Sequence, residues 1–172
     1  LLAAQARFCQ AQSRLQLPLN ELPGDLLHSA LLSMRTLVGT ESDADERAAA
    51  AEAQIRVGYD EAASRLGLMS RIVEGMGNGA AAALSVTHAG TAIFLSALAI
   101  GSGQDRDAAV FSTDEAQVAR LALGLRAGGL RQQGIEEQFL ALHPDVSLPD
   151  GFDRVSSDRA AAVLSVASYH GE

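Results

Sequence analysis

His88 is the residue with the clearest potential for chemistry, because it lies in a long segment that has no charged side chain. Residues 75–104 carry no formal charge, and an imidazole titrates near neutral pH. Thr87 and Thr91 place hydroxyl groups close to it in the sequence. Thr87, His88 and Thr91 are therefore the first candidates for a ligand site or a buried polar switch. We favour the simpler interpretation, a buried neutral histidine that is hydrogen-bonded to a carbonyl or hydroxyl group.

Other residues that could do chemistry lack suitable neighbours. His28, His143 and His170 lie far apart without an i,i+4 partner, and Cys9 is the only cysteine, so the common zinc motifs are absent. The glycines of residues 75–79 alternate as in a phosphate-binding loop, but that loop follows a strand, whereas a helix is expected here. The sequence therefore predicts no catalytic residue, no metal and no cofactor, and we expect a protein that is not an enzyme.

The uncharged segment has the length of a membrane span but not its composition. Its strongly apolar residues contribute only about −2 to −4 kcal/mol to insertion, and hydroxyl groups, a histidine and a glycine oppose insertion. Arg71 and Arg106 flank it symmetrically, so the positive charge does not favour one side. A helix that is apolar on all sides in a soluble protein is buried. The sequence predicts a buried central helix over 79–100, or two helices that meet at Gly90, and membrane association is not expected.

The remaining segments predict helices around this centre. Apolar residues recur about every 3.6 positions from Ala44 to Met76, which is the period of a helix. We expect a long amphipathic helix over 43–77, with a kink or break near Gly58 or Gly67 because glycine disfavours helix. N-terminal helices are expected over 1–40 and helical hairpins over 112–170. A chain of 172 residues suits one domain, so the predicted fold is a single all-α domain over 1–172, a helical bundle or short array of helical hairpins.

Periodicity also predicts which residues of the shorter helices face inward. Ser112 and Glu115 have the spacing of a capping box, and the glycine pair 128–129 predicts the end of the helix that this box begins. The residues expected to face inward are Leu27, Leu31, Met34 and Val38, then Val118, Leu121, Ala122 and Leu125, then Ile135, Phe139 and Leu142, and finally Ala160, Val163, Leu164 and Ala167.

The charge balance disfavours nucleic acid as a partner. The net charge is −8, and all 13 basic residues are arginine, whereas binding to phosphate backbones depends on an excess of cations. A helix-turn-helix around 128–129 would present Glu136 and Glu137 to the phosphates. The absence of lysine is typical of a GC-rich bacterial genome, and a lone thiol agrees with a reducing cytoplasm. We expect a bacterial, cytoplasmic protein.

Five segments of the chain carry a family resemblance: 59–62, 94–99, 102–106, 119–130 and 139–144. They resemble an alphaproteobacterial domain-of-unknown-function family made of HEAT-like helical hairpins, and the resemblance extends over about 44–167. It implies an all-helical scaffold from a bacterium. It implies no catalytic residues.

The leading functional hypothesis is a non-enzymatic protein-interaction or regulatory module. Long amphipathic helices with small residues permit close helix contact, and they predict a protein partner or a homodimer through 44–76. The rival hypothesis is a small-molecule sensor or an enzyme with an inter-helix pocket near His88, since helical bundles often house ligands in their cores.

Overall fold

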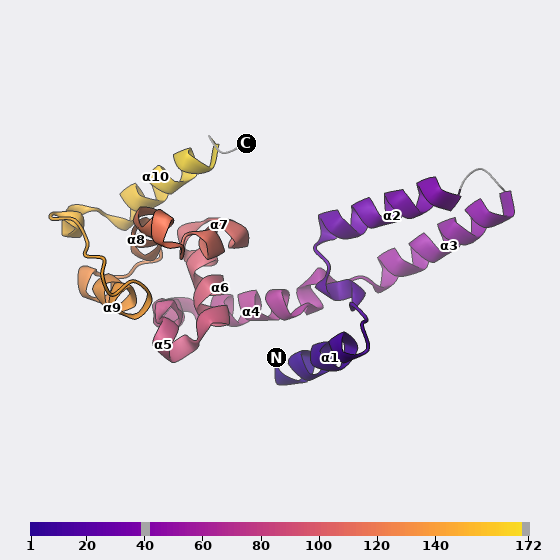
Figure 1. Cartoon of the computed structure of the whole chain (residues 1–172), viewed down its shortest axis with the longest axis horizontal. Coiled ribbons are helices and arrows are strands. Elements are labelled where there is room, and N and C mark those ends of the chain that lie inside the picture. The colour runs from indigo at the N-terminus through magenta and orange to yellow at the C-terminus, as the bar shows by residue number, and fades with distance from the viewer. Residues whose placement is uncertain (39–41, 170–172) are drawn as a thin grey trace. The chain divides into compact units, whose positions relative to one another are not determined.

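The chain is built mainly of helices in the residues that its computed structural model describes, which are 1–38 and 42–169 (Figure 1). These residues form ten α-helices and five short 3-10 helices, and none of them is in a strand. The predicted all-α fold is confirmed. The predicted element ends at 40 and 170, and the side chain of His170, lie outside the described residues.

The chain divides into two compact units, Leu1–Leu68 and Met69–Glu172. This division differs from the single domain expected over 1–172. The reason is the distribution of buried apolar side chains. The main hydrophobic core lies in the second unit, from Val73 to Phe152. In the described part of the first unit, the buried apolar residues are Ala4, Leu27, Leu31 and Ala48.

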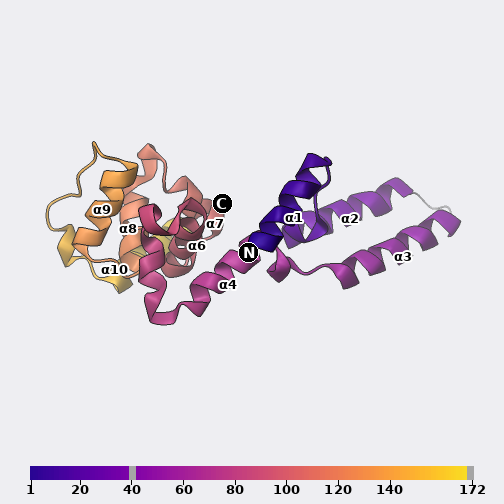
Figure 2. The same ribbon diagram turned by 90° about the horizontal axis from the view of Figure 1, so that it is seen from below.

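An antiparallel helical hairpin dominates the first unit. The helices α2 (Gly24–Val38) and α3 (Ser42–Gly58) lie side by side in two perpendicular views (Figures 1 and 2). The predicted inward stripe of α2 is confirmed, because Leu27 and Leu31 are buried while Met34 and Val38 are half-buried.

Arg65 connects the other elements of this unit, α1 (Leu2–Ser13) and the 3-10 helix Leu19–Glu21. Its guanidinium lies 3.2 Å from the centre of the Phe8 ring. Its Nε donates to Glu21 at 3.1 Å, and Nη1 donates to Gln5 at 3.3 Å. One cation thus ties three segments together through charge and stacking.

The single helix expected over 43–77 is interrupted. The structure has α3, a 3-10 helix at Glu61–Ala63 and α4 (Arg65–Gly75). The predicted break near Gly58 is confirmed. Two contacts accompany the break. The Asp60 carboxylate accepts from the backbone N–H of Ala62 at 3.0 Å, which competes with helical hydrogen bonding. The Tyr59 hydroxyl donates to the distant Leu22 carbonyl at 2.7 Å.

The single buried helix expected over 79–100 is also interrupted. The structure has a 3-10 helix at Gly77–Leu84, then α5 (Val86–Ala89) and α6 (Thr91–Ser102). The predicted break at Gly90 is confirmed: its φ of 78° lies in the left-handed region that favours glycine. The central helix is therefore the shorter α6, whose Phe94 and Leu98 are almost fully buried.

The rest of the second unit packs around α6 and α8. Its elements are α7 (Arg106–Phe111), the 3-10 helix Glu115–Gln117, α8 (Val118–Ala127), α9 (Gln132–Leu142), the 3-10 helix Phe152–Arg154 and α10 (Ser157–Tyr169). Helix α8 contacts α6, α9 and α10. These contacts explain why its predicted face, with Leu121, Ala122 and Leu125, is buried.

The predicted ends of these helices are partly right. Glycines 128 and 129 end α8, and the Leu130 N–H donates to the Leu125 carbonyl at 3.1 Å, as expected of a glycine-based cap. The capping box at Ser112 is wrong: Asp114 caps the turn through Ala116 N, while Ser112 is buried and donates to the Ala109 carbonyl. In α10, Ala160 and Leu164 are buried as predicted, but residues 163 and 167 are exposed.

Candidate functional site

His88 is exposed, so the prediction of a buried histidine is wrong. It lies on α5, a single helical turn on which Val86 and Ala89 face inward and Thr87 faces out with His88. Its Nδ1 lies 2.7 Å from Ser85 Oγ and 3.2 Å from Thr87 Oγ1. The structure therefore joins His88 to Thr87 and to Ser85, which the sequence analysis missed.

Thr91 does not belong to this cluster. It begins α6 on the other side of Gly90 and is exposed, and none of the hydrogen bonds within the described residues joins its side chain to His88. The sharp turn at Gly90 separates the two residues, because it breaks the helix in which they would be i,i+3 neighbours.

A serine next to a histidine could form a nucleophile–base pair. Such a pair needs a third group that orients the imidazole through its other nitrogen. Within the described residues, every hydrogen bond from the His88 ring involves Nδ1, and none involves Nε2. The cluster instead braces a turn, in which the Ser85 carbonyl also accepts from the backbone N–H groups of His88 and Ala89.

A hollow of about 470 Å³ lies beside this cluster within the second unit. Its wall includes Gln138, a buried residue on α9 whose Oε1 accepts from the backbone N–H of Val86 at 2.8 Å. Gln138 thereby fixes the start of α5 against α9. The sequence analysis missed it, although a glutamine one helical turn from both Ile135 and Leu142 already lies on the inward face. The lining residues are Ala81, Ala82, Leu84, Ser85, His88, Leu130, Gly134, Glu137 and Gln138.

Arg106 occupies a second polar position, at the start of α7. Its guanidinium donates to Ser96 Oγ at 2.9 Å and to Ser70 Oγ at 3.3 Å. Burial lowers the pKa of the Arg106 guanidinium, and the charge of Asp107 acts in the opposite direction. The contacts connect α7 with α6 and α4, so Arg106 braces the packing of the second unit.

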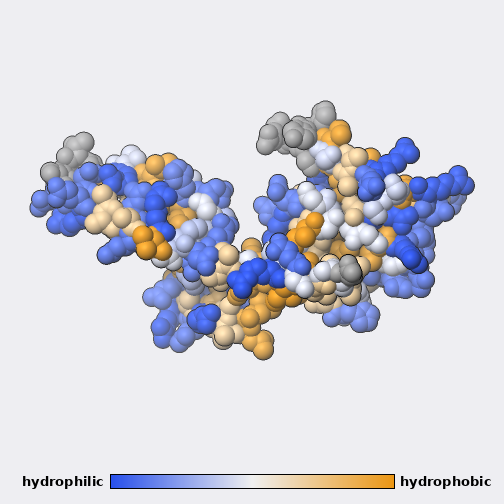
Figure 3. Space-filling model, turned by 180° about the vertical axis from the view of Figure 1, so that it is seen from behind, coloured by the Kyte–Doolittle hydropathy of each residue, from blue (hydrophilic) through white to orange (hydrophobic). Residues whose placement is uncertain are grey.

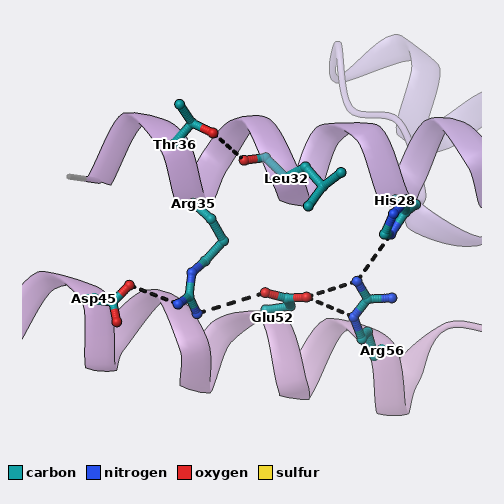
Figure 4. A network of polar contacts seen from close by, with 7 residues as sticks. All are labelled: His28, Leu32, Arg35, Thr36, Asp45, Glu52 and Arg56. Carbon is teal, nitrogen blue, oxygen red and sulfur yellow. Dashed lines mark hydrogen bonds and ion pairs between the residues drawn. The ribbon is translucent and has the colours of Figure 1, made fainter. Parts of the chain in front are cut away.

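The α2–α3 hairpin carries an ion-pair network along one side (Figure 4). Arg35 lies 2.8 Å from Asp45 and 3.9 Å from Glu52, and Arg56 lies 2.8 Å from Glu52. Arg56 also contacts His28 Nδ1 at 3.4 Å. Each exposed pair contributes little stability. The contacts of Arg35 and the contact between Arg56 and His28 join the two helices, whereas the Arg56–Glu52 pair lies within α3.

The opposite side of the hairpin is apolar, and we call it the apolar edge. On α2, residues 26, 30 and 37 form a stripe next to the buried stripe of Leu27 and Leu31. This second stripe lies on the side of the helix away from His28 and Arg35. Leu26 is 53% exposed and Leu37 is 86% exposed. Hydrophobic side chains are visible among hydrophilic ones on the molecular surface (Figure 3). The apolar edge consists of three exposed residues of α2 and three half-buried residues of α3: Leu26, Ala30 and Leu37, and Ala44, Ala51 and Ile55.

In the part of the chain that the structure describes, no group of three or more His, Cys, Asp and Glu residues is arranged to hold a metal ion, and Cys9 is exposed. No helix in the same residues combines the length and the apolar character that a membrane span requires.

Comparison of the chain with protein-family models, curated proteins and solved structures gave no match. The resemblance to the alphaproteobacterial helical family therefore stays a prediction.

Proposed function

We propose that this chain is a non-enzymatic protein-interaction module that associates with a second copy of itself through the apolar edge of the α2–α3 hairpin. The observation that carries the proposal is the division of this hairpin into an ion-paired side and an apolar side, on which Leu26 and Leu37 of α2 are exposed and the α3 residues are half-buried. Water-exposed leucines at helical spacing are typical of a surface that another helix covers.

The size of the first unit's core supports a partner. Two helices packed on each other leave much of their apolar surface in water, and a unit of this size has a marginal core even when it is well filled. Among the described residues of this unit, the buried apolar side chains are two leucines and two alanines. Two hairpins packed edge to edge would form a four-helix arrangement, which is self-sufficient in many proteins.

The composition of the edge favours a second hairpin over an extended peptide. Ala44 and Ala51 on α3 are small, so they permit a close approach of another helix, and Leu26 and Leu37 can fill the space beside such residues in a symmetric contact. The proposed contact involves α2 and α3. Its α3 residues lie in the first half of 44–76, the segment that the sequence predicts to form a homodimer.

Sedimentation velocity at increasing protein concentration tests the proposal. We expect a dimer, and we expect Leu26→Glu to weaken it. Burying the exposed half of Leu26 contributes about 1 kcal/mol per copy, so losing it in both copies should raise the dissociation constant roughly 30-fold. The charge introduced by glutamate adds to this loss.

Leu32→Glu is the matched control. Leu32 lies on the same helix and is 55% exposed, almost the same as Leu26, but it is outside the apolar edge. It should leave association unchanged. A wild-type chain that remains monomeric at high micromolar concentration refutes the homodimer, and equal effects of the two substitutions refute the proposed surface.

A second candidate function is ligand binding in the hollow beside His88. It is favoured by the polar groups of Ser85 and His88, which line a space of about 470 Å³. A ligand held there should perturb the imidazole signals of His88 in NMR spectra, and His88→Leu should abolish its binding. Screening that finds no such ligand favours the interaction module.

A further inference from the structure

A second concave site lies within the second unit, between α8, α9 and the segment 143–155, which we call the strap. Its volume is about 310 Å³. Its walls are the first half of α8, Phe139 of α9 and apolar side chains of the strap. The lining residues are Val118, Ala119, Ala122, Leu123, Phe139, Val146, Ser147, Leu148, Pro149, Phe152 and Val155.

The lining of this pocket continues the hydrophobic core. Ala122, Phe139 and Phe152 form its floor and are themselves members of the buried core. No charged side chain lines the pocket, and Ser147, its one hydroxyl-bearing residue, is exposed. A ligand at the floor would meet only carbon, so a charged or strongly polar group there would lose its hydration without compensation.

The volume indicates the size of the occupant. An apolar cavity of about 150 Å³ holds one benzene ring. This pocket has about twice that volume, which is enough for an alkyl chain of about ten carbons. It also reaches the lower end of the range typical of small-molecule sites, about 300 Å³. It therefore has room for more than the one side chain that a docked helix would insert.

Short hydrogen-bonded turns lie near both ends of the strap, and α8 holds its last residues. Near its start, the Val146 N–H donates to the His143 carbonyl at 3.0 Å, and later the Phe152 N–H donates to the Pro149 carbonyl at 3.2 Å. Arg126 of α8 donates to the carbonyls of Asp153 and Val155. Within the described residues, none of the backbone hydrogen bonds outside helices involves 147 or 148. The pocket wall at Leu148 is held by apolar contact and can adjust to a ligand.

We infer that this pocket binds an uncharged apolar small molecule, with an alkyl chain on the floor and any polar group at the open end beside Ser147. This site is separate from the apolar edge of the hairpin, and the inference does not depend on self-association.

The test uses the full chain and the fluorescent probe N-phenyl-1-naphthylamine, with 1-decanol as competitor. We expect saturable binding of one probe per chain and its displacement by 1-decanol. Decane-1,10-diol should compete at least 10-fold less well, because it would place a hydroxyl group on the apolar floor. Absence of saturable binding, or equal competition by the diol, overturns the inference.

Two variants locate the site. Ala119 is exposed on α8 at the pocket wall, so Ala119→Phe should fill the opening and weaken 1-decanol binding at least 10-fold while the chain stays folded. Ala161→Phe, at an exposed position of α10 outside the pocket, should bind as the wild type does.

Methyl NMR of the wild-type chain provides a measurement that does not depend on a variant. Added 1-decanol should shift the methyl signals of Val118, Leu123 and Leu148, and should leave those of Leu26 and Leu37 unchanged. Shifts confined to the hairpin leucines would overturn the inference. If Ala119→Phe weakens self-association and leaves 1-decanol binding intact, the pocket is a protein contact and the inference is wrong.

Discussion

Arg126 should be the side chain on which the strap depends most. It lies in the last turn of α8, and its guanidinium donates to three backbone carbonyls: Leu130 at 3.1 Å, Asp153 at 2.7 Å and Val155. The first bond stabilises the end of the helix, while the other two fix the end of the strap. We expect Arg126→Met to destabilise the second unit and to loosen the strap before the rest of the unit unfolds.

The size of the effect follows from these three bonds. A hydrogen bond from a charged donor contributes about 1.5–3 kcal/mol when it is well shielded. The bonds to Leu130 and Val155 are partly buried and the bond to Asp153 is exposed, so water can replace some of them. The free energy of unfolding should fall by about 2–4 kcal/mol. Lysine can reach one carbonyl at a time, so Arg126→Lys should recover less than half of this loss.

Hydrogen exchange read by mass spectrometry is the suitable assay, because it reports each segment separately. The amides of Phe152 and Val155 should exchange faster in Arg126→Met, while those of α6 should change less. Arg120→Met, on the same helix, is the control and should leave the strap amides unchanged. Wild-type protection of the strap in Arg126→Met, or a stability change below about 0.5 kcal/mol, would refute the assigned role.

Two further predictions concern single groups. Gln138→Met keeps the volume of the side chain but leaves the Val86 N–H without its acceptor. Thermal unfolding should show that the free energy of unfolding falls by about 1–3 kcal/mol. The control Gln133→Met, on the exposed side of α9, should have little effect. Burial, with the charge of Glu61, raises the pKa of the Tyr59 phenol above its ordinary value. The folded state therefore holds this proton more tightly than the unfolded state does. The contribution to stability is fully present below about pH 10 and is lost as the pH rises further. Melting curves from about pH 8 to about pH 11 should show a steeper fall for the wild type than for Tyr59→Phe, and parallel falls would contradict this.

Helices whose ends are set locally could be predicted from the sequence. The inward face of α8 and its end at Gly128 and Gly129 follow from periodicity and glycine, and both agree with the structure. The break after α3 was expected at Gly58, but its full extent was not. It depends on contacts of Tyr59 and Asp60 with Leu22 and Asn20, about 40 positions earlier, and helical periodicity contains no information about such contacts.

The candidate site could be predicted only in part, because burial was inferred from the composition of a segment and not from its local turns. A run of uncharged residues indicates that the segment as a whole is near a core. It does not indicate which side of a one-turn helix faces inward, and in α5 that side carries Val86 and not His88. Ser85 precedes α5 in an extended conformation, and this conformation brings its hydroxyl group to the imidazole. Neither pocket volume nor the exposure of Leu26 can be predicted without the packing of several elements.

The two proposed surfaces differ in shape and in their place along the chain, and this difference provides a joint test. The apolar edge belongs to residues 26–55 and is offered by two helices side by side, whereas the α8–α9 pocket belongs to residues 118–155 and is concave. Leu26→Glu should therefore weaken self-association and leave 1-decanol binding unchanged, and Ala119→Phe should do the opposite. If each substitution weakens both processes, one surface is responsible for both, and the assignment of separate protein and ligand sites is wrong. If the two effects separate as expected, the chain combines an association module with an independent receptor for an apolar molecule.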